Sequence, residues 1–184
     1  MTIGVPGNVP YVITVGAMSD NYTPRDPTDD VLASFSAAGP TFEGFVKPEV
    51  VAPGGHILGW MPPHGSLSLN HPEFMHEDEE YFTMSGTSQA AAVVSGAAAL
   101  LLDAQPWLTP DQVKCKLMAS SRPAVDGKGA LAYSVFQQGA GMINVFDAVY
   151  GSQFDCANRG LDIDADLAGE RHFGGRANKD TDGN

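Results

Sequence analysis

Residues 84–102 read MSGTSQAAAVVSGAAALLL, and this stretch decides the fold. After Gln89 it holds only Ala, Val and Leu, apart from Ser95 and Gly96. A helix that is apolar around its whole circumference is buried inside a domain. We therefore expect other elements to cover every side of this helix, and its small side chains allow them to approach closely. Residues 103–106, with Pro106 at the end, terminate it.

Ser88 stands in the first turn of this predicted helix, directly after Gly86 and Thr87. Unpaired N–H groups and the positive end of the helix dipole gather at such a position. These groups stabilise the negative oxygen that forms during acyl transfer. Gly86 permits a sharp turn and the close approach of a substrate backbone. The alternative, which the local pattern alone favours, is that Ser88 or Thr87 is an ordinary helix cap.

The charge of the chain is strongly negative. Its 184 residues hold 22 acidic and 10 basic side chains, a formal net charge of −12. Nucleic acids and anionic membranes bind basic surfaces, so we expect neither as a partner. The richest apolar run, Ala90–Leu102, is also shorter than the roughly 18 residues of a membrane span. Lysine and arginine are absent between Lys47 and Lys114, which predicts a solvated acidic surface; the alternative is electrostatic selection of basic substrates.

Several weaker patterns predict the elements before the apolar helix. Val9–Ala17 is a β-branched run after a Pro-Gly-Asn turn and predicts a strand buried on both faces. Val50–Ala52 is a second short apolar stretch, which stops at Pro53. Residues 59–80 are rich in Pro, His and Glu and predict an irregular, exposed insertion.

The region after the apolar helix begins with a clear helix start. Thr109 is the expected N-cap, Pro110 takes the first helical position, and Gln112 completes a capping box. This helix should reach about Ser120. Residues 142–150 predict a further short helical or mixed segment.

The composition changes near Gly151, where large apolar side chains become sparse. We therefore divide the chain into residues 1–150 and an acidic tail, residues 151–184. In the tail, Leu161–Leu167 alternates strictly between apolar and acidic residues, which predicts an amphipathic strand. The tail is accordingly expected to be the β-rich start of an appended segment.

The two cysteines, Cys115 and Cys156, are too few for a disulfide framework. Cys115 lies inside the predicted helix after Thr109, where a small buried apolar side chain is the usual role. A Cys115–Cys156 bridge is the alternative. Neither cysteine has the spacing of a metal ligand.

Five segments in a fixed order resemble the subtilase family, the subtilisin-like serine proteases. Residues 84–100 are similar to the family's serine motif, which reads roughly Gly-Thr-Ser-Met-Ala-Ala/Ser-Pro-His-Val-Ala-Gly. The other four segments are residues 2–17, 33–40, 47–54 and 139–144. The resemblance covers about residues 2–150. Gln89 in place of Met, and Ala92-Val93 in place of Pro-His, are departures that we interpret as subgroup variation.

The resemblance implies an α/β fold with a doubly wound parallel sheet, present here in part, and endopeptidase chemistry on protein or peptide substrates. Ser88 would be the catalytic nucleophile, which forms an acyl-enzyme without any cofactor. Gly86 and Thr87 would contact substrate, and Gly4 would form the floor of the pocket for the side chain before the scissile bond. The family also implies an extracellular location, although residues 1–7 do not have the pattern of a signal peptide.

Other parts of the family's catalytic machinery are missing from the pattern. Neither an Asp-Thr/Ser-Gly nor a His-Gly-Thr segment precedes Ser88, and the motif of the oxyanion Asn is also absent. We therefore expect the C-terminal half of a catalytic domain, inactive in isolation, with the N-terminal half as its partner. The alternative is a non-catalytic, subtilase-derived scaffold that binds a partner.

A local histidine would have to replace the missing base if this chain were active alone. His56 follows Gly55 and could lie near the cleft floor, which leaves an unrelated Ser88–His56 hydrolase as a third hypothesis. We expect this histidine at the surface, and the same holds for the others, which are His64, His71, His76 and His172.

The resemblance also raises the question of structural calcium. Its ligands would be the Glu49 carboxylate and the carbonyl groups of Gly7, Val9 and Val12, since oxygen ligands suit a hard cation. Glu49 is longer than the Asp often found there, and we assign no metal. The His and acidic residues at 71–80 lack the spacing of a known site, and residues 178–183 predict a polar turn rather than a calcium loop.

Overall fold

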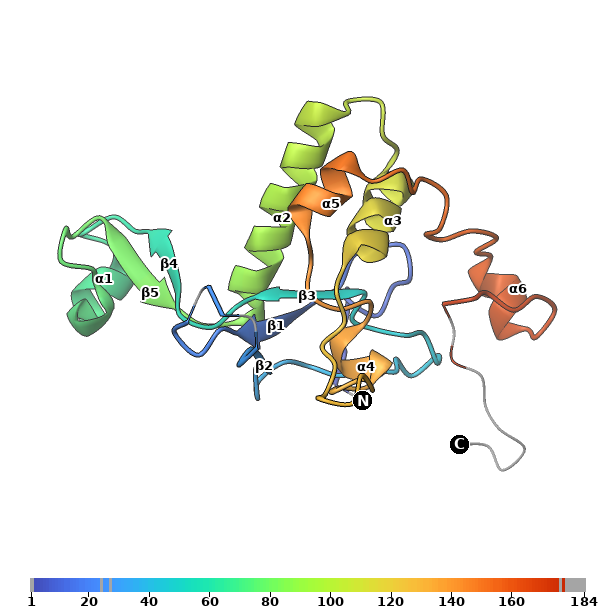
Figure 1. Ribbon diagram of the computed structural model, residues 1–184, viewed down its shortest axis with the longest axis horizontal. Coiled ribbons are helices and arrows are strands. Elements are labelled where there is room, and N and C mark those ends of the chain that lie inside the picture. Colours follow the sequence, from blue (N-terminus) through green and yellow to red (C-terminus); the bar gives the residue numbers. More distant parts are fainter. Residues whose placement is uncertain (1, 24, 27, 176, 178–184) are drawn as a thin grey trace.

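The computed structural model describes residues 2–23, 25–26, 28–175 and 177 (Figure 1). The polar turn predicted at residues 178–183 therefore lies outside the described residues. In chain order the elements are β1 (Val15–Ser19), β2 (Val31–Leu32), β3 (Val50–Pro53), β4 (Ile57–Trp60), α1 (Ser66–Asn70), η1 (Pro72–Phe74), β5 (Tyr81–Met84), α2 (Thr87–Ala104), α3 (Pro110–Ser120), α4 (Val135–Gln138), α5 (Val145–Tyr150) and α6 (Ile163–Leu167).

The central sheet has the order β2-β1-β3, with β1 and β3 parallel and β2 antiparallel to β1. Residues 141–143 run beside β3, since the Val51 N–H donates to the Gly141 carbonyl and the Ile143 N–H donates to the Val51 carbonyl. The α/β class is as expected. The full doubly wound sheet is not seen in the described residues, where one parallel pair forms the centre.

The predicted strand Val9–Ala17 is wrong at its start, because β1 begins at Val15. The carbonyl groups of Pro10 and Val12 accept hydrogen bonds from buried lysine ammonium groups. Residues 5–12 form turns and bends, and these two carbonyl groups accept hydrogen bonds from side chains rather than from a neighbouring strand.

Helix α2 is buried on one side only. It packs on β1 and β3 with α3 and α5 nearby (Figure 1), and its buried residues are Ala90, Val94, Ala97 and Leu101. Leu100 and Leu102 are 57% and 42% exposed. The prediction that every side is covered is therefore wrong for this chain, since nothing among the described residues covers the remaining side.

By length and composition alone, α2 is long and apolar enough to cross a membrane, with 18 residues and a mean hydropathy of 1.3. The apolar run Ala90–Leu102 is itself shorter, as noted from the sequence, and the helix reaches this length because it also includes residues 87–89, 103 and 104. A core helix of a globular domain has the same composition. The packing of α2 on the sheet supports that second interpretation.

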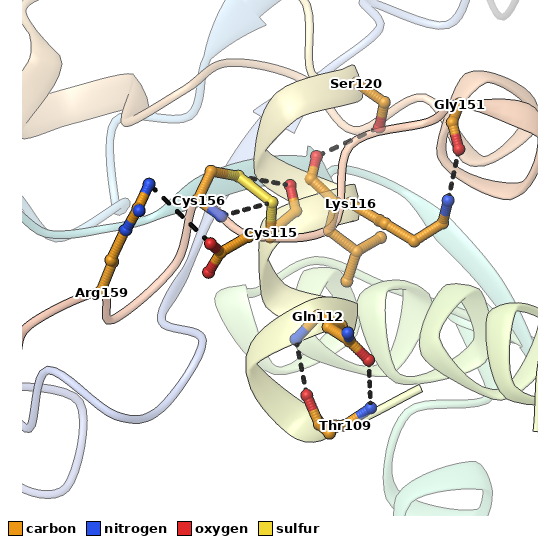
Figure 2. The surroundings of a disulfide bond; sticks show 10 residues. Thr109, Gln112, Cys115, Lys116, Ser120, Gly151, Cys156 and Arg159 are labelled. Carbon is orange, nitrogen blue, oxygen red and sulfur yellow. Dashed lines mark hydrogen bonds and ion pairs between the residues drawn. A yellow bond between two sulfur atoms is a disulfide. The ribbon is translucent and has the colours of Figure 1, made fainter. Parts of the chain in front are cut away.

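Helix α3 begins and ends where the sequence predicts. The Thr109 side chain accepts from the Gln112 N–H, and the Gln112 side chain accepts from the Thr109 N–H, which is a complete capping box (Figure 2). Val113 and Leu117 are buried together. The helix at 145–150 also lies within the segment for which helical structure was expected.

A disulfide joins Cys115 of α3 to Cys156, 41 positions later in the sequence (Figure 2). Cys115 is fully buried, as expected, but the favoured interpretation as a lone apolar side chain is wrong. Beside the bridge, Lys116 donates to the Gly151 carbonyl and lies over the Phe154 ring, 4.5 Å from its centre. Residues 151–158 are therefore held against α3.

The tail contains a helix where a strand was predicted, α6. Asp162 caps it, because its carboxylate accepts from the Ala165 N–H. Aspartate favours helix N-termini and is depleted in strands, so capping outweighed the alternation of apolar and acidic residues. In the described part of the tail there is no strand.

The insertion is exposed as predicted but is not irregular. Strands β4 and β5 pair antiparallel from Ile57↔Met84 to Trp60↔Tyr81, and α1 and η1 lie between them in sequence. The unit projects from the rest of the molecule (Figure 1).

Replacing both cysteines, Cys115→Ala with Cys156→Ala, tests the contribution of the bridge to stability. Opening a loop of this length enlarges the entropy of the unfolded chain, so we expect the free energy of unfolding to fall by about 4 kcal/mol. Urea denaturation measures it, and wild-type protein under reducing conditions should match the double variant. Equal stability of oxidised wild type and double variant would contradict this role.

Candidate active site

Ser88 is the second residue of α2, and its side chain is exposed. Gly86 is the N-cap, and no side chain caps the helix. The alternative that Ser88 or Thr87 is an ordinary cap is therefore not what the structure shows. The Ser88 hydroxyl stands where helix N–H groups and the dipole favour negative charge. This is the environment that an oxyanion requires.

A close backbone contact fixes the start of α2. The Gly86 N–H donates to the Gly54 carbonyl at 2.8 Å. A Cβ atom on Gly54 would lie 2.7 Å from the Ala17 Cβ and 2.9 Å from the Gly86 carbonyl oxygen. An added side chain at position 54 would therefore overlap its neighbours, and this role of Gly54 was not predicted from the sequence. The sequence feature that could have indicated this close contact is the glycine pair directly after Pro53.

The residues before Ser88 are tied to the start of β4. The Ser85 hydroxyl accepts from the His56 N–H at 2.8 Å, and the His56 ring stacks on Tyr22 with ring centres 4.0 Å apart. Gln89 donates to the Met84 sulfur at 3.7 Å. In the described chain there is no hydrogen bond between the His56 ring and Ser88.

All five histidines are exposed, as expected. His71 pairs with Glu73, and His76 pairs with Asp78. Backbone hydrogen bonds are the largest cause that lowers the pKa of Glu73 and of Asp78, and the hydrogen bond with each histidine lowers it further. No group of three His, Cys, Asp or Glu side chains that could hold a metal occurs within the described residues.

The predicted substrate contacts fall into two places. Gly86 and Thr87 adjoin Ser88 at the start of α2. Gly4 lies in the exposed loop before β1, where its carbonyl accepts from the Asn8 N–H. A Cβ atom at Gly4 would meet no atom within 4 Å, so this position leaves open space. Their roles toward substrate stay predictions.

Two of the candidate calcium ligands, Glu49 and the Val12 carbonyl, contact two lysines. Glu49 Oε1 accepts from Lys47 Nζ at 2.5 Å and from Lys114 Nζ at 2.7 Å, and all three side chains are buried. The Val12 carbonyl accepts from both ammonium groups. The Gly7 carbonyl accepts from the Thr14 hydroxyl, and the Val9 carbonyl accepts from the Val12 N–H.

These contacts do not fit a bound cation. Positive charge is already supplied by side chains of the chain, and every proposed ligand oxygen has a protein donor. Burial lowers the pKa of Lys47, and the Glu49 carboxylate opposes that shift. Sequence reasoning missed both lysines, because Lys47 and Lys114 are 67 positions apart and meet only in the fold.

Gly54→Ala tests the contact that fixes α2. We expect the free energy of unfolding to fall by about 1–3 kcal/mol, since the added methyl group overlaps atoms of β1 and of Gly86. Gly96→Ala is the matched control, because Gly96 lies inside α2 with open space around an added Cβ. It should stabilise the chain by about 1 kcal/mol. Urea denaturation of both variants measures the difference, and the same sign for both would contradict the assignment.

Glu49→Gln tests the buried ion cluster. It leaves two buried ammonium groups without a carboxylate, and we expect a loss of about 3–5 kcal/mol in the free energy of unfolding. The exposed Glu170→Gln should change it by less than about 0.5 kcal/mol. Chelator should leave the wild-type unfolding midpoint unchanged, whereas a large drop would show that a cation occupies this place.

The comparisons with known proteins agree on one family. The model of the subtilase family matches residues 1–141. Serine protease AprX of Bacillus subtilis (strain 168) is 39% identical over 150 residues, which are 82% of this chain and 32% of AprX. The chain thus spans about a third of that relative, and it spans 17% of the subtilisin-like protease SBT4.7 of Arabidopsis thaliana, to which it is 32% identical.

Two solved structures are similar to the fold. The prenylagaramide maturation protease PagA has a TM-score of 0.55 and 31% identity, covering 79% of this chain and 44% of PagA. Fervidolysin from Fervidobacterium pennivorans, a keratinolytic enzyme related to subtilisin, has a TM-score of 0.59 and 27% identity, covering 80% of this chain and 20% of fervidolysin. With its exposed serine at the start of α2, the chain belongs to the subtilase family of serine proteases.

Proposed function

We propose that this chain carries the nucleophile of a subtilisin-type serine endopeptidase that hydrolyses proteins or peptides. The observation that carries the proposal is the exposed Ser88 at the uncapped N-terminus of α2. Its Oγ would attack the scissile carbonyl carbon, while the Ser88 N–H donates to the resulting oxyanion. Collapse of that intermediate would release the amine and leave an acyl group on Ser88, which water then hydrolyses.

This chain alone is proposed to be inactive. A serine hydroxyl is a weak nucleophile at neutral pH without a base, and no histidine ring is hydrogen-bonded to Ser88 in the described chain. The N-terminal half of a catalytic domain would supply the Asp, the His and the oxyanion Asn, and would complete the doubly wound sheet. The uncovered apolar side of α2 supports this partner, since Leu100 and Leu102 lie there.

An extracellular location is part of the proposal. The Cys115–Cys156 disulfide suits an oxidising compartment. No cofactor is required for the acyl transfer. Nucleic acid and membrane are not proposed as partners, because the net charge is −12.

The second candidate function is a subtilase-derived scaffold that binds a partner without catalysis. The same uncovered side of α2 favours it, because an apolar surface of this kind needs a cover. The two candidates differ in whether Ser88 reacts once the missing half is present.

A chimera tests the proposal: this chain replaces the 150 matching residues of AprX. We expect a fluorophosphonate to label the chimera at Ser88, as located by mass spectrometry, and to leave the isolated chain unlabelled. Ser88→Ala should abolish labelling and reduce peptide hydrolysis by about 10⁶-fold.

AprX itself is the positive control, and a cooperative unfolding transition shows that the chimera is folded. A folded, unlabelled chimera would overturn the enzyme proposal in favour of the scaffold. Labelling of the isolated chain at Ser88 would show that a base is present in it, and His56→Ala then identifies whether that base is His56.

A further inference from the structure

The β4–β5 hairpin has two unlike faces. Its register places Leu58, Trp60 and Tyr81 on one face and Phe82 on the other. Phe82 is 4% exposed and packs edge-on against Phe74 of η1, with ring centres 5.9 Å apart. On the opposite face Leu58, Trp60 and Tyr81 are 47%, 69% and 37% exposed. This second face, called here the outer face, also contains Thr83, which pairs with Leu58, and its three large side chains are exposed in the described chain.

The hairpin also has one open edge. The edge of β5 that faces away from β4 is occupied, because Met75 forms a β-bridge with Phe82 and the His76 N–H donates to the Tyr81 carbonyl. Within the described residues, no backbone hydrogen bond joins β4 to any segment except β5. An extended peptide can add to such an edge as a further strand.

Four acidic residues directly precede β5 in the sequence. Residues 77–80 are Glu-Asp-Glu-Glu, all exposed, and they lead into β5 at Tyr81. No lysine or arginine occurs between Lys47 and Lys114 to neutralise them, although Asp78 pairs with His76. A ligand that covers the apolar face and carries positive charge would be complementary to both features.

Both strands of the hairpin connect to the serine segment. β5 ends at Met84, four residues before Ser88, and the Ser85 hydroxyl accepts from the His56 N–H immediately before β4. We propose that the outer face and the β4 edge bind an extended segment of a protein substrate in which lysine or arginine alternates with apolar residues. This specificity surface rests on the proposed function, because it selects the substrate that Ser88 would cleave.

The chain has two tryptophans, Trp60 and Trp107. When Trp107 is replaced, tryptophan fluorescence comes from Trp60 alone and reports on the outer face. Trp107 is 71% exposed, so Trp107→Phe should be tolerated. The full chain, with Trp107→Phe and Ser88→Ala, is titrated with the peptide acetyl-Gly-Phe-Lys-Leu-Arg-Gly-amide. We expect a saturable blue shift of Trp60 emission. The same peptide with Glu at both basic positions should bind at least about tenfold more weakly.

Matched variants separate the apolar and the charged contributions. Leu58→Ser should weaken peptide binding by about tenfold, whereas Leu131→Ser, at a leucine that is similarly exposed at 52%, should leave it unchanged. Replacing Glu77, Glu79 and Glu80 by Gln should weaken binding of the basic peptide and reduce its salt dependence, whereas Glu170→Gln should not.

Three results would overturn the proposal: no response of Trp60 to the basic peptide, equal binding of the acidic peptide, or a blue shift that grows with protein concentration in the absence of peptide. The last would mean that a second copy covers the outer face. Because the binding assay uses Ser88→Ala protein, its failure leaves labelling of the chimera unaffected, and failed labelling leaves the binding result standing.

Discussion

The packing of α2 on the parallel pair β1–β3 is the constraint on which the rest of the structure depends. Small side chains form this contact, and Ala17 of β1 and Ala90 of α2 are fully buried in it. Gly54 lies close to both alanines and to the backbone of Gly86. Each such side chain buries little apolar area, so the gain comes from close approach of helix and sheet. The same closeness allows the Gly54–Gly86 hydrogen bond, which fixes where the helix begins and hence where Ser88 stands.

A second constraint holds the remaining segments to this layer. Glu49 stands at the start of β3, its carboxylate accepts from Lys47, from Lys114 and from the Thr14 N–H, and its backbone carbonyl accepts from the Ala140 N–H. Burying two ammonium groups with one carboxylate costs solvation energy, which the carbonyl groups of residues 10 and 12 partly offset. Such a cluster contributes specificity: the loop before β1, the strand and α3 must meet in one arrangement, or a charge is left unpaired.

Sequence reasoning succeeded where the determinants are local. The capping box of α3 lies within four consecutive residues, and the family's serine motif lies within residues 84–100, so both could be recognised without the fold. It failed where partners are distant: Lys114 meets the Pro10 carbonyl across 104 residues, and Cys115 meets Cys156 across 41. The hairpin was hidden for a related reason, because the intervening Pro, His and Glu residues suggest a loop, while the pairing of Trp60 with Tyr81 spans it.

The structure leaves two apolar surfaces uncovered, and their chemistry indicates different partners. The side of α2 is aliphatic, and residues 88–102 contain no charged side chain, as in surfaces that are permanently buried. The outer face of the hairpin combines aromatic side chains with four adjacent acids, a composition suited to contacts that form and dissociate. β5 ends at Met84 and α2 begins at Thr87, so Ser88 lies at the junction between the helix that carries the first surface and the hairpin that carries the second. The two surfaces extend away from this junction, since Leu100 lies 12 residues beyond Ser88 along α2 and Trp60 pairs with Tyr81 at the end of the hairpin away from Met84. A half-domain that covers α2 therefore leaves the hairpin open to a second partner.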